Sequence, residues 1–272
     1  LTIKAGVFKD YRSPMICEVQ GEKYIFATQL KKNTLQRSVA LFRLNQRNRI
    51  EKEQILLADK TSREFLSLLY MREKYYLLTR DCKNDLFVFY EMGQDVFTWK
   101  KYAVLEITEN LVNTVATYIN DRVYLTGSLL ESNADNRAVF VQFEIVDFFN
   151  PGKISSVLKW KGSDNNYYSI HAGNWFYREG VRYRALEKST RKQRGKSVII
   201  EEIVENTQGG KKTKMLAEIT VNSVECELPA FIYRKLGVSA YSYLEGYEVL
   251  ELLVQHFSLG RLGAKLLRKI QR

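Results

Sequence analysis

Short runs of hydrophobic residues alternate along most of the chain with tight polar turns, and the runs are rich in Val, Ile, Tyr and Phe. This pattern is typical of antiparallel strands. One arrangement recurs, in which an apolar run and a short polar turn lead into a strand that opens with a Tyr. Its four copies are G-E-K-Y-I-F-A-T-Q (21–29), R-E-K-Y-Y-L-L-T-R (72–80), N-D-R-V-Y-L-T-G-S (120–128) and E-G-V-R-Y-R-A-L-E (179–187). The chain is therefore built largely from one repeated unit.

Each unit contains four candidate strands. The anchoring tyrosines recur roughly every 50 to 60 residues, at Tyr24, Tyr75, Tyr124 and Tyr183. A third run follows each anchor, beginning at Ser38, Asp85, Ala138 and Ser197, and a fourth run spans 52–58, 97–105, 154–160 and 214–220. Repeats of this length predict an all-β fold, a β-propeller of about five four-stranded blades. A β-sandwich with similar hairpins is the alternative.

The last part of the chain departs from this repeat. We assign 1–222 to the blades and 223–272 to a closing segment or partial fifth blade, whose anchor falls near Tyr247, followed by a helix. The helix is predicted because apolar residues keep helical spacing while basic residues fill the other positions. The apolar positions are Leu259, Leu262, Leu266 and Ile270. Such a basic amphipathic helix packs on the propeller flank, or docks on an anionic membrane surface or a protein partner.

Composition narrows the class of protein. Hydrophobic residues make up 45% of the chain and charged residues 27%, as in a folded globular domain. No run of about 18 apolar residues exists, which argues against a membrane-spanning helix. The net charge of +11 attracts anionic partners by long-range steering. Leu1 is not an initiator methionine, so the sequence leaves the native start open.

Cysteine and histidine usage bears on location and cofactors. Cys17, Cys82 and Cys226 are widely spaced and odd in number, which argues against a disulfide framework or a zinc site. This usage favours a reducing compartment, and we expect a cytoplasmic protein. The chain has only His171 and His256 and no nucleotide-binding motif, so no cofactor and no metal site are expected.

The units resemble the blades of the five-bladed propellers of glycoside hydrolase families 43 and 32, over about residues 5 to 220. The matching stretches are Y-R-S-P-M-I-C-E-V-Q-G-E-K-Y-I-F, F-L-S-L-L-Y-M-R-E-K-Y-Y-L-L, N-T-V-A-T-Y-I-N-D-R-V-Y-L and H-A-G-N-W-F-Y-R-E-G-V-R-Y. The resemblance implies three acids: a carboxylate just before the Pro of unit one, an Asp opening unit three and a Glu opening unit four. Glycoside hydrolysis needs one carboxyl as acid and another as base or nucleophile.

The corresponding positions hold Ser13, Asn113 and His171, and none of them is a carboxylate. Losing one proton-transfer group costs about 10² to 10⁴ in rate, so we expect a catalytically degenerate relative. Asp10, three residues from the expected base, and His171, with its near-neutral pKa, are the remaining catalytic candidates. Ser and Asn still hydrogen-bond to hydroxyls. The candidate ligand-binding residues are Ser13, Asn113, His171, Asn174 and Trp175, with Tyr177 as a further aromatic platform.

Three functions remain open. The leading interpretation is a propeller that binds a carbohydrate or glycan-linked ligand as an accessory to glycan or glycolipid assembly. An active glycoside hydrolase using Asp10 is the second. A docking scaffold for protein or nucleic acid is the third. Nucleic acid ranks below a glycan because most aromatic residues occupy strand positions that packing explains.

Overall fold

The computed structural model describes residues 9–31, 33–57, 61–130, 138–163, 168–173, 175–190, 193–205, 211–220, 233–244 and 247–256. Within these ranges all regular structure is β-strand, and no helix is present that could cross a membrane. The predicted helix at 259–272 lies outside the described residues. His256 ends strand β19 and pairs with Tyr233.

Three antiparallel sheets of four strands each come first along the chain. Blade 1 contains β1 (Lys9–Val19), β2 (Glu22–Lys31), β3 (Arg37–Leu44) and β4 (Ile50–Leu56). Blade 2 contains β5 (Arg63–Met71), β6 (Lys74–Asp81), β7 (Leu86–Met92) and β8 (Trp99–Leu105). Blade 3 contains β9 (Leu111–Ile119), β10 (Arg122–Leu130), β11 (Ala138–Val146) and β12 (Ser155–Ser163). In each sheet, strand order follows chain order.

The fourth and fifth sheets are less regular. Blade 4 contains β13 (Tyr168–His171), β14 (Phe176–Arg178), β15 (Val181–Thr190), β16 (Gln193–Glu205) and β17 (Lys211–Thr220), and both β13 and β14 pair with β15. The fifth sheet is the hairpin of β18 (Tyr233–Leu244) and β19 (Tyr247–His256). The propeller prediction is confirmed, but the count of about five four-stranded blades is wrong. The described residues form four blades and a two-stranded sheet. The boundary set at 222 lies outside them.

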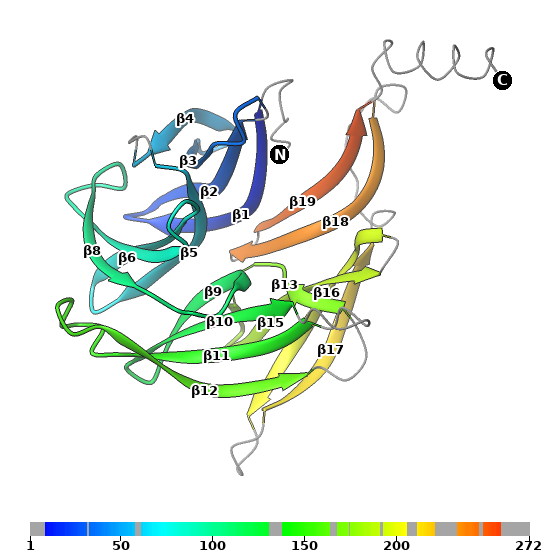
Figure 1. Ribbon diagram of the computed structural model, residues 1–272. Coiled ribbons are helices and arrows are strands. Elements are labelled where there is room, and N and C mark those ends of the chain that lie inside the picture. Colours follow the sequence, from blue (N-terminus) through cyan, green and yellow to red (C-terminus); the bar gives the residue numbers. More distant parts are fainter. Residues whose placement is uncertain are drawn as a thin grey trace, which may run out of the picture.

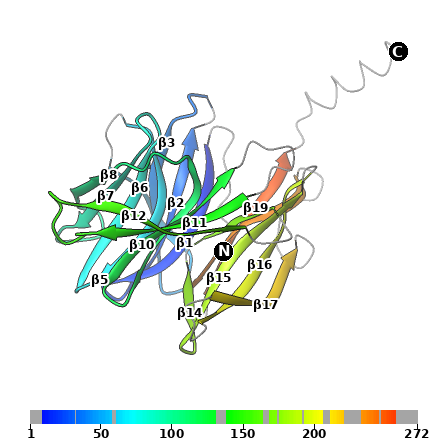
Figure 2. The ribbon, with the colours of Figure 1, turned by 60° about the horizontal axis from the view of Figure 1, so that its bottom comes forward.

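The sheets are arranged around a common axis, and the first strand of each sheet lies nearest to this axis (Figure 1). β1 contacts β5, β5 contacts β9, β9 contacts β13, and β18 contacts both β14 and β1. The orange hairpin thus lies between blade 1 and blade 4, and Figure 2 shows it alongside β15 and β16. Four antiparallel strands return the chain to the end where it started, so every first strand runs the same way. We call the end with the β1–β2, β5–β6, β9–β10 and β14–β15 turns the turn end, and the other the loop end.

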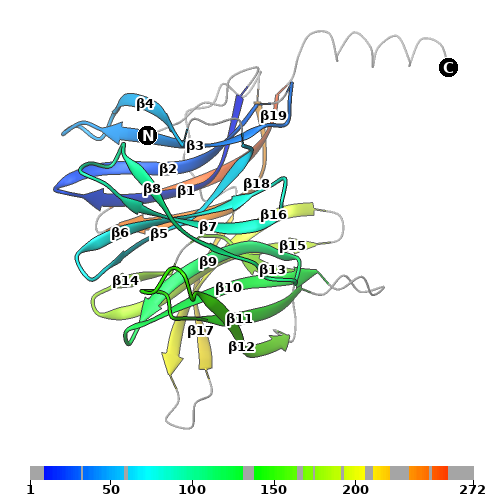
Figure 3. The same ribbon diagram turned by 60° about the vertical axis from the view of Figure 1, so that its left-hand side comes forward.

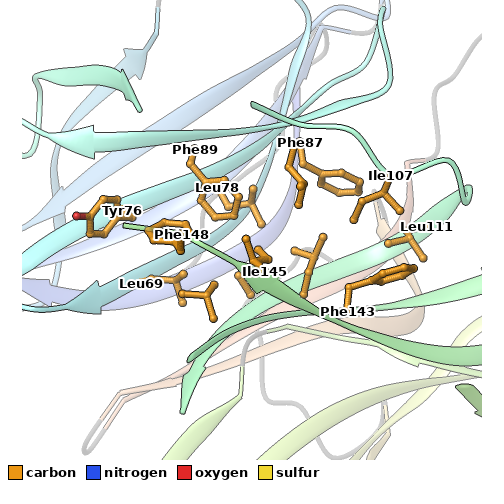
Figure 4. Packing of buried hydrophobic residues seen from close by; sticks show 14 of the residues in the cluster. Leu69, Tyr76, Leu78, Phe87, Phe89, Ile107, Leu111, Phe143, Ile145 and Phe148 are labelled. Carbon is orange, nitrogen blue, oxygen red and sulfur yellow. The ribbon is translucent and has the colours of Figure 1, made fainter. Parts of the chain in front are cut away.

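Successive blades pack face to face, as the blue, cyan and green sheets do in Figure 3. Blades 1 and 2 share a buried cluster that includes stacked Phe26 and Phe65 rings, 5.6 Å apart at their centroids. Blades 2 and 3 share a second one, in which Tyr76, Phe89 and Phe148 meet edge to face (Figure 4). These aromatic and aliphatic faces supply most of the apolar burial that holds the ring together.

The contact between blades 3 and 4 is more polar. Thr126, Ser128 and Gln142 of blade 3 are all buried. Facing them, Arg184 of β15 forms an ion pair with Glu201 at 2.7 Å, and the two side chains are only 12% and 16% exposed. The Arg184 guanidinium also lies 5.4 Å from the centroid of the Phe140 ring of β11. Buried polar side chains and the Arg184–Glu201 ion pair therefore replace part of the apolar packing at this joint.

Hydroxyl groups also tie neighbouring blades to one another. The first strand of each blade has a free edge toward the axis, and its buried N–H groups need acceptors. Thr28 Oγ1 accepts the Phe65 N–H at 2.9 Å, and Ser67 Oγ accepts the Ala116 N–H at 2.8 Å. Ser242 Oγ of β18 accepts the Ile16 N–H at 3.0 Å and so joins the hairpin to blade 1.

The structure shifts one of the four repeat anchors by a residue. Tyr24 packs into the cluster shared with the next blade, and the residue of blade 2 that does the same is Tyr76. Tyr75 points the other way and donates to the Glu18 carbonyl at 3.3 Å. Because Tyr75 and Tyr76 are adjacent, either of them fits the spacing of the repeat anchors. A shift of one residue along a strand moves the side chain to the opposite face of the sheet.

Candidate functional site

The first strands of blades 1 to 3 are irregular at the same level, toward the loop end. In β1 the pairing slips between Arg12 and Met15, so that Ser13 and Pro14 oppose the single residue Ala27. Blades 2 and 3 repeat this bulge: Leu66 is the extra residue in β5, and Asn113 and Thr114 oppose Gly127 in blade 3. In blade 4 the first strand is instead broken between β13 and β14, opposite Arg184. Bulges re-aim side chains and are enriched next to binding sites.

The bulges of blades 1 and 3 hold the backbone in an unusual conformation. Ser13 has φ 51° and Asn113 has φ 49°. All other non-glycine residues with positive φ in the described part of the chain lie outside strands. Asn adopts the left-handed backbone conformation more readily than Ser, for which it raises the conformational free energy. Such strain inside a strand is more common at functional sites than elsewhere.

Gly127 makes room for the bulge of blade 3. A Cβ atom at this position would lie 3.1 Å from Thr114 Oγ1 and 3.4 Å from the Leu111 Cβ. The close approach of β9 to β10 therefore needs a residue without a side chain, which explains a glycine inside an otherwise regular strand.

The sequence candidates for ligand binding occupy or adjoin these bulges. Ser13 is exposed and Asn113 is half-buried. His171 ends β13, where its backbone pairs with Leu186, and Trp175 is half-buried directly before β14. Asn174 lies outside the described residues. Ser13, Asn113 and His171 thus lie at one level, opposite the third residue after the anchor of each blade, whereas Trp175 lies in the break opposite Arg184, nearer the turn end.

Asp10 has the surroundings of an ordinary surface carboxylate. Its side chain is 34% exposed, and its Oδ2 lies 3.8 Å from the Arg12 guanidinium. Its Oδ1 accepts the Tyr11 N–H at 3.1 Å. Asp10 is thus a partly exposed carboxylate whose contacts are a neighbouring guanidinium and a backbone N–H.

Blade 4 contains a buried carboxyl group that the sequence pattern did not indicate. Glu187 of β15 is fully buried. It follows its anchor by four residues, as Thr28 and Ser128 follow theirs, and all three are buried polar side chains. Ala185, two residues earlier on the same face, packs on the side of blade 4 opposite Arg184, so Glu187 faces the fifth sheet. Its position matches that of Thr28, which bonds to the next blade, rather than that of an axial acid.

Two hollows open at the turn end, away from the bulges. One, of about 740 Å³, lies on blade 1 and is lined by residues 21–23, 43–48 and 51. The other, of about 400 Å³, lies where blade 2 meets blade 3 and is lined by Arg72 and residues 121–123 and 144–150. Sequence analysis predicted neither, because both are formed by turns from different strands.

Within the described part of the chain, no group of three or more His, Cys, Asp or Glu side chains could hold a metal ion. Cys17 is a buried free thiol whose burial raises its pKa, and Cys82 is a half-buried free thiol. Cys226 lies outside the described residues.

The fold is shared with solved glycoside hydrolases. An α-L-arabinofuranosidase from Lactobacillus brevis aligns with a TM-score of 0.56 and 11% identity, over 92% of this chain and 85% of its own. A GH43 β-xylosidase/α-arabinofuranosidase from a compost microbial metagenome, solved with xylotriose, aligns at 0.56 and 12%, over 91% of both chains. An exo-1,5-α-L-arabinanase from a bovine ruminal metagenomic library aligns at 0.50 and 13%, over 74% and 76%.

These likenesses define the class of protein as a β-propeller with a glycoside hydrolase-like fold. At 11 to 13% identity they establish the fold alone. No protein-family model and no curated protein sequence matches the chain. Function must therefore be argued from the residues at the site.

Proposed function

We propose that the protein binds a carbohydrate or glycan-linked ligand at the loop-end mouth of the axis and does not hydrolyse it. The observation that carries the proposal is the pair of equivalent bulges in β1 and β9, where Ser13 and Asn113 hold left-handed backbone inside strands. Their uncharged polar side chains can donate to and accept from sugar hydroxyls. His171, which ends β13 and pairs with Leu186, Trp175, directly before β14, and Asn174, which lies outside the described residues, complete the proposed site.

The absence of catalysis is supported by the groups at these positions. Ser13 and Asn113 cannot serve as carboxylic acid or base, and Asp10 is a partly exposed, ion-paired carboxylate. Hydrolysis by two carboxyl groups requires them on either side of the scissile bond, roughly 5 to 9.5 Å apart. The fully buried Glu187, which faces the fifth sheet, is a poor second partner for Asp10.

The binding proposal is tested by isothermal titration with arabinohexaose and xylotriose as probes. Asn113→Ala should weaken binding about tenfold, because one hydrogen bond contributes about 0.5–1.5 kcal/mol. Asn48→Ala is the matched control, since Asn48 also has positive φ, 56°, but lies in a turn of blade 1 away from the axis. Equal affinity in the wild type and Asn113→Ala would contradict the proposed site.

An active hydrolase remains the second candidate, favoured by the activities named for the structures that share the fold. Incubation with a panel of aryl α-L-arabinofuranosides and β-xylosides should release no chromophore above background. Turnover that disappears in Asp10→Asn would establish hydrolysis and overturn the degenerate assignment.

The biological setting is part of the proposal. A non-hydrolytic glycan-binding propeller suits an accessory role in glycan or glycolipid assembly. The free thiols of Cys17 and Cys82 are consistent with a reducing, cytoplasmic location. The basic segment 259–272 would contact an anionic membrane surface or a protein partner.

A further inference from the structure

A tyrosine recurs at one register position of the innermost strands. The penultimate residues of β5, β9, β14 and β18 are Tyr70, Tyr118, Tyr177 and Tyr243. In β1 the same position holds Glu18. Because the first strands surround the axis and all run toward the turn end, these residues ring the turn-end mouth, opposite the bulges.

We call this set the tyrosine rim. Tyr118 packs against the cluster shared by blades 2 and 3, but packing does not explain Tyr70 and Tyr177. Tyr70 is 59% exposed and Tyr177 is 57% exposed, and they are among the few large hydrophobic side chains exposed in the described residues. A tyrosine whose role is to pack in the hydrophobic core would have most of its ring buried. Exposed aromatic groups gathered at one mouth indicate a binding surface.

Neighbouring contacts hold the rim in place. The Tyr70 ring lies against the Tyr75 ring, with centroids 4.6 Å apart and planes tilted by 40°. The Tyr75 hydroxyl donates to the Glu18 carbonyl at 3.3 Å and so fixes this pair beside the end of β1. The Tyr118 hydroxyl donates to Asp121 Oδ1 at 2.6 Å. Two of the rings are thus positioned in advance, which lowers the entropic cost of binding.

The charges around the rim are balanced, although the whole chain is strongly basic. Arg178 lies 3.8 Å from Glu179, and Arg122 lies 3.3 Å from Glu144. The Arg72 guanidinium is stacked 3.6 Å from the Phe149 ring centroid. A groove for nucleic acid needs a continuous row of cations beside its stacking platforms. Here acids alternate with the guanidinium groups, so that hydrogen-bond acceptors and donors for the hydroxyl groups of a neutral ligand lie side by side.

We propose that the tyrosine rim binds a neutral oligosaccharide, which stacks on the exposed rings of Tyr70 and Tyr177. Tyr118, Asp121 and the Glu18 carboxylate supply hydrogen-bond partners for its hydroxyl groups. This surface is separate from the loop-end bulges and does not depend on a ligand being bound there.

The test is native gel electrophoresis toward the cathode in gels containing soluble arabinoxylan or glucomannan. The wild type should be retarded, and Tyr70→Ser/Tyr177→Ser should lose about tenfold in affinity, because both aromatic stacking faces are removed. Tyr70→Phe/Tyr177→Phe keeps the rings and should keep most of the retardation. Leu35→Ser is the matched control, because Leu35 is 71% exposed at the loop end.

Three outcomes overturn the proposal. In the first, neither polysaccharide retards the wild type. In the second, the wild type and the double serine variant are retarded equally. In the third, the rim instead binds an oligo-dT or proline-rich peptide probe in a tyrosine-dependent way.

Asn113→Ala separates this proposal from the proposed function. If the loop-end site does not bind a glycan, retardation that depends on the tyrosines should still be observed. If the rim does not bind one, Asn113→Ala should still weaken arabinohexaose binding.

Discussion

Single hydroxyl groups form hydrogen bonds between neighbouring blades, and Thr28 is the clearest case. Its side chain is 1% exposed, and its Oγ1 accepts the Phe65 N–H at 2.9 Å. Thr28→Val keeps the shape but leaves a buried N–H without an acceptor, which costs about 1–3 kcal/mol. Urea unfolding should show this loss, whereas Thr34→Val, at an exposed turn, should unfold like the wild type. An unchanged midpoint in Thr28→Val would contradict the role assigned to the hydroxyl.

Tyr11 links stability to alkaline pH. The pKa of Tyr11 is raised to about 12, first by burial and then by the neighbouring Glu53. The Tyr11 hydroxyl donates a hydrogen bond to Glu53 Oε1 at 2.8 Å. The folded state therefore favours the protonated phenol. This contribution is complete below the ordinary pKa near 10 and is lost as pH rises from about 10 to 12.

In Tyr11→Phe, the fall in unfolding free energy between pH 9 and 11 should be shallower than in the wild type. Urea titrations at each pH measure this slope. Other buried tyrosines, such as Tyr76, keep part of the dependence in the variant. Identical slopes would show that Tyr11 titrates alike in the folded and unfolded chains.

At the scale of elements, the bulge of blade 3 depends on Gly127. Gly127→Ala would press a methyl group against Thr114 Oγ1, 3.1 Å away, and such overpacking costs about 1–3 kcal/mol. Adding Thr114→Ala should relieve part of this strain. Thermal unfolding of the single and double variants measures both effects. Gly152→Ala serves as the control, since a Cβ there meets nothing within 4 Å.

The strands of blades 1 to 3 could be predicted from sequence because each carries Val, Ile, Tyr and Phe between turn residues. β3, for example, begins at Arg37, one residue before the predicted Ser38. The choice between Tyr75 and Tyr76 could not be made, because which face is buried depends on the neighbouring blade. The sequence predicted a closing segment or partial fifth blade with its anchor near Tyr247, and the described residues there form the hairpin of β18 and β19.

Part of the candidate site was predictable for the same reason. Counting from the anchors placed Ser13 and Asn113 on matching positions, and the structure gives both the same bulge. Glu187 and the tyrosine rim were missed because each is recognised only after strands far apart in sequence are aligned. A register count from the turns, rather than from the anchors, would have shown the Tyr near the end of β5, β9, β14 and β18.

At the scale of the molecule, the joints between blades differ in kind. Large apolar clusters join blade 1 to blade 2 and blade 2 to blade 3, whereas Thr126, Gln142 and the Arg184–Glu201 pair line the joint of blades 3 and 4. Regions with less apolar contact open more readily. Hydrogen exchange followed by mass spectrometry should therefore show slower exchange in β6 and β7 than in β15 and β16. Equal protection would mean that the ring opens as one unit.

The bond between Ile16 and Ser242 joins residues 226 positions apart. A ribosome makes the chain from its first residue onward, so blade 1 emerges long before β18 exists to meet it. The inner edge of β1 must remain without this partner while about 200 further residues are synthesised, which takes on the order of 10 to 40 s at 5–20 residues per second. Chaperone demand during translation should accordingly fall once β18 has left the exit tunnel.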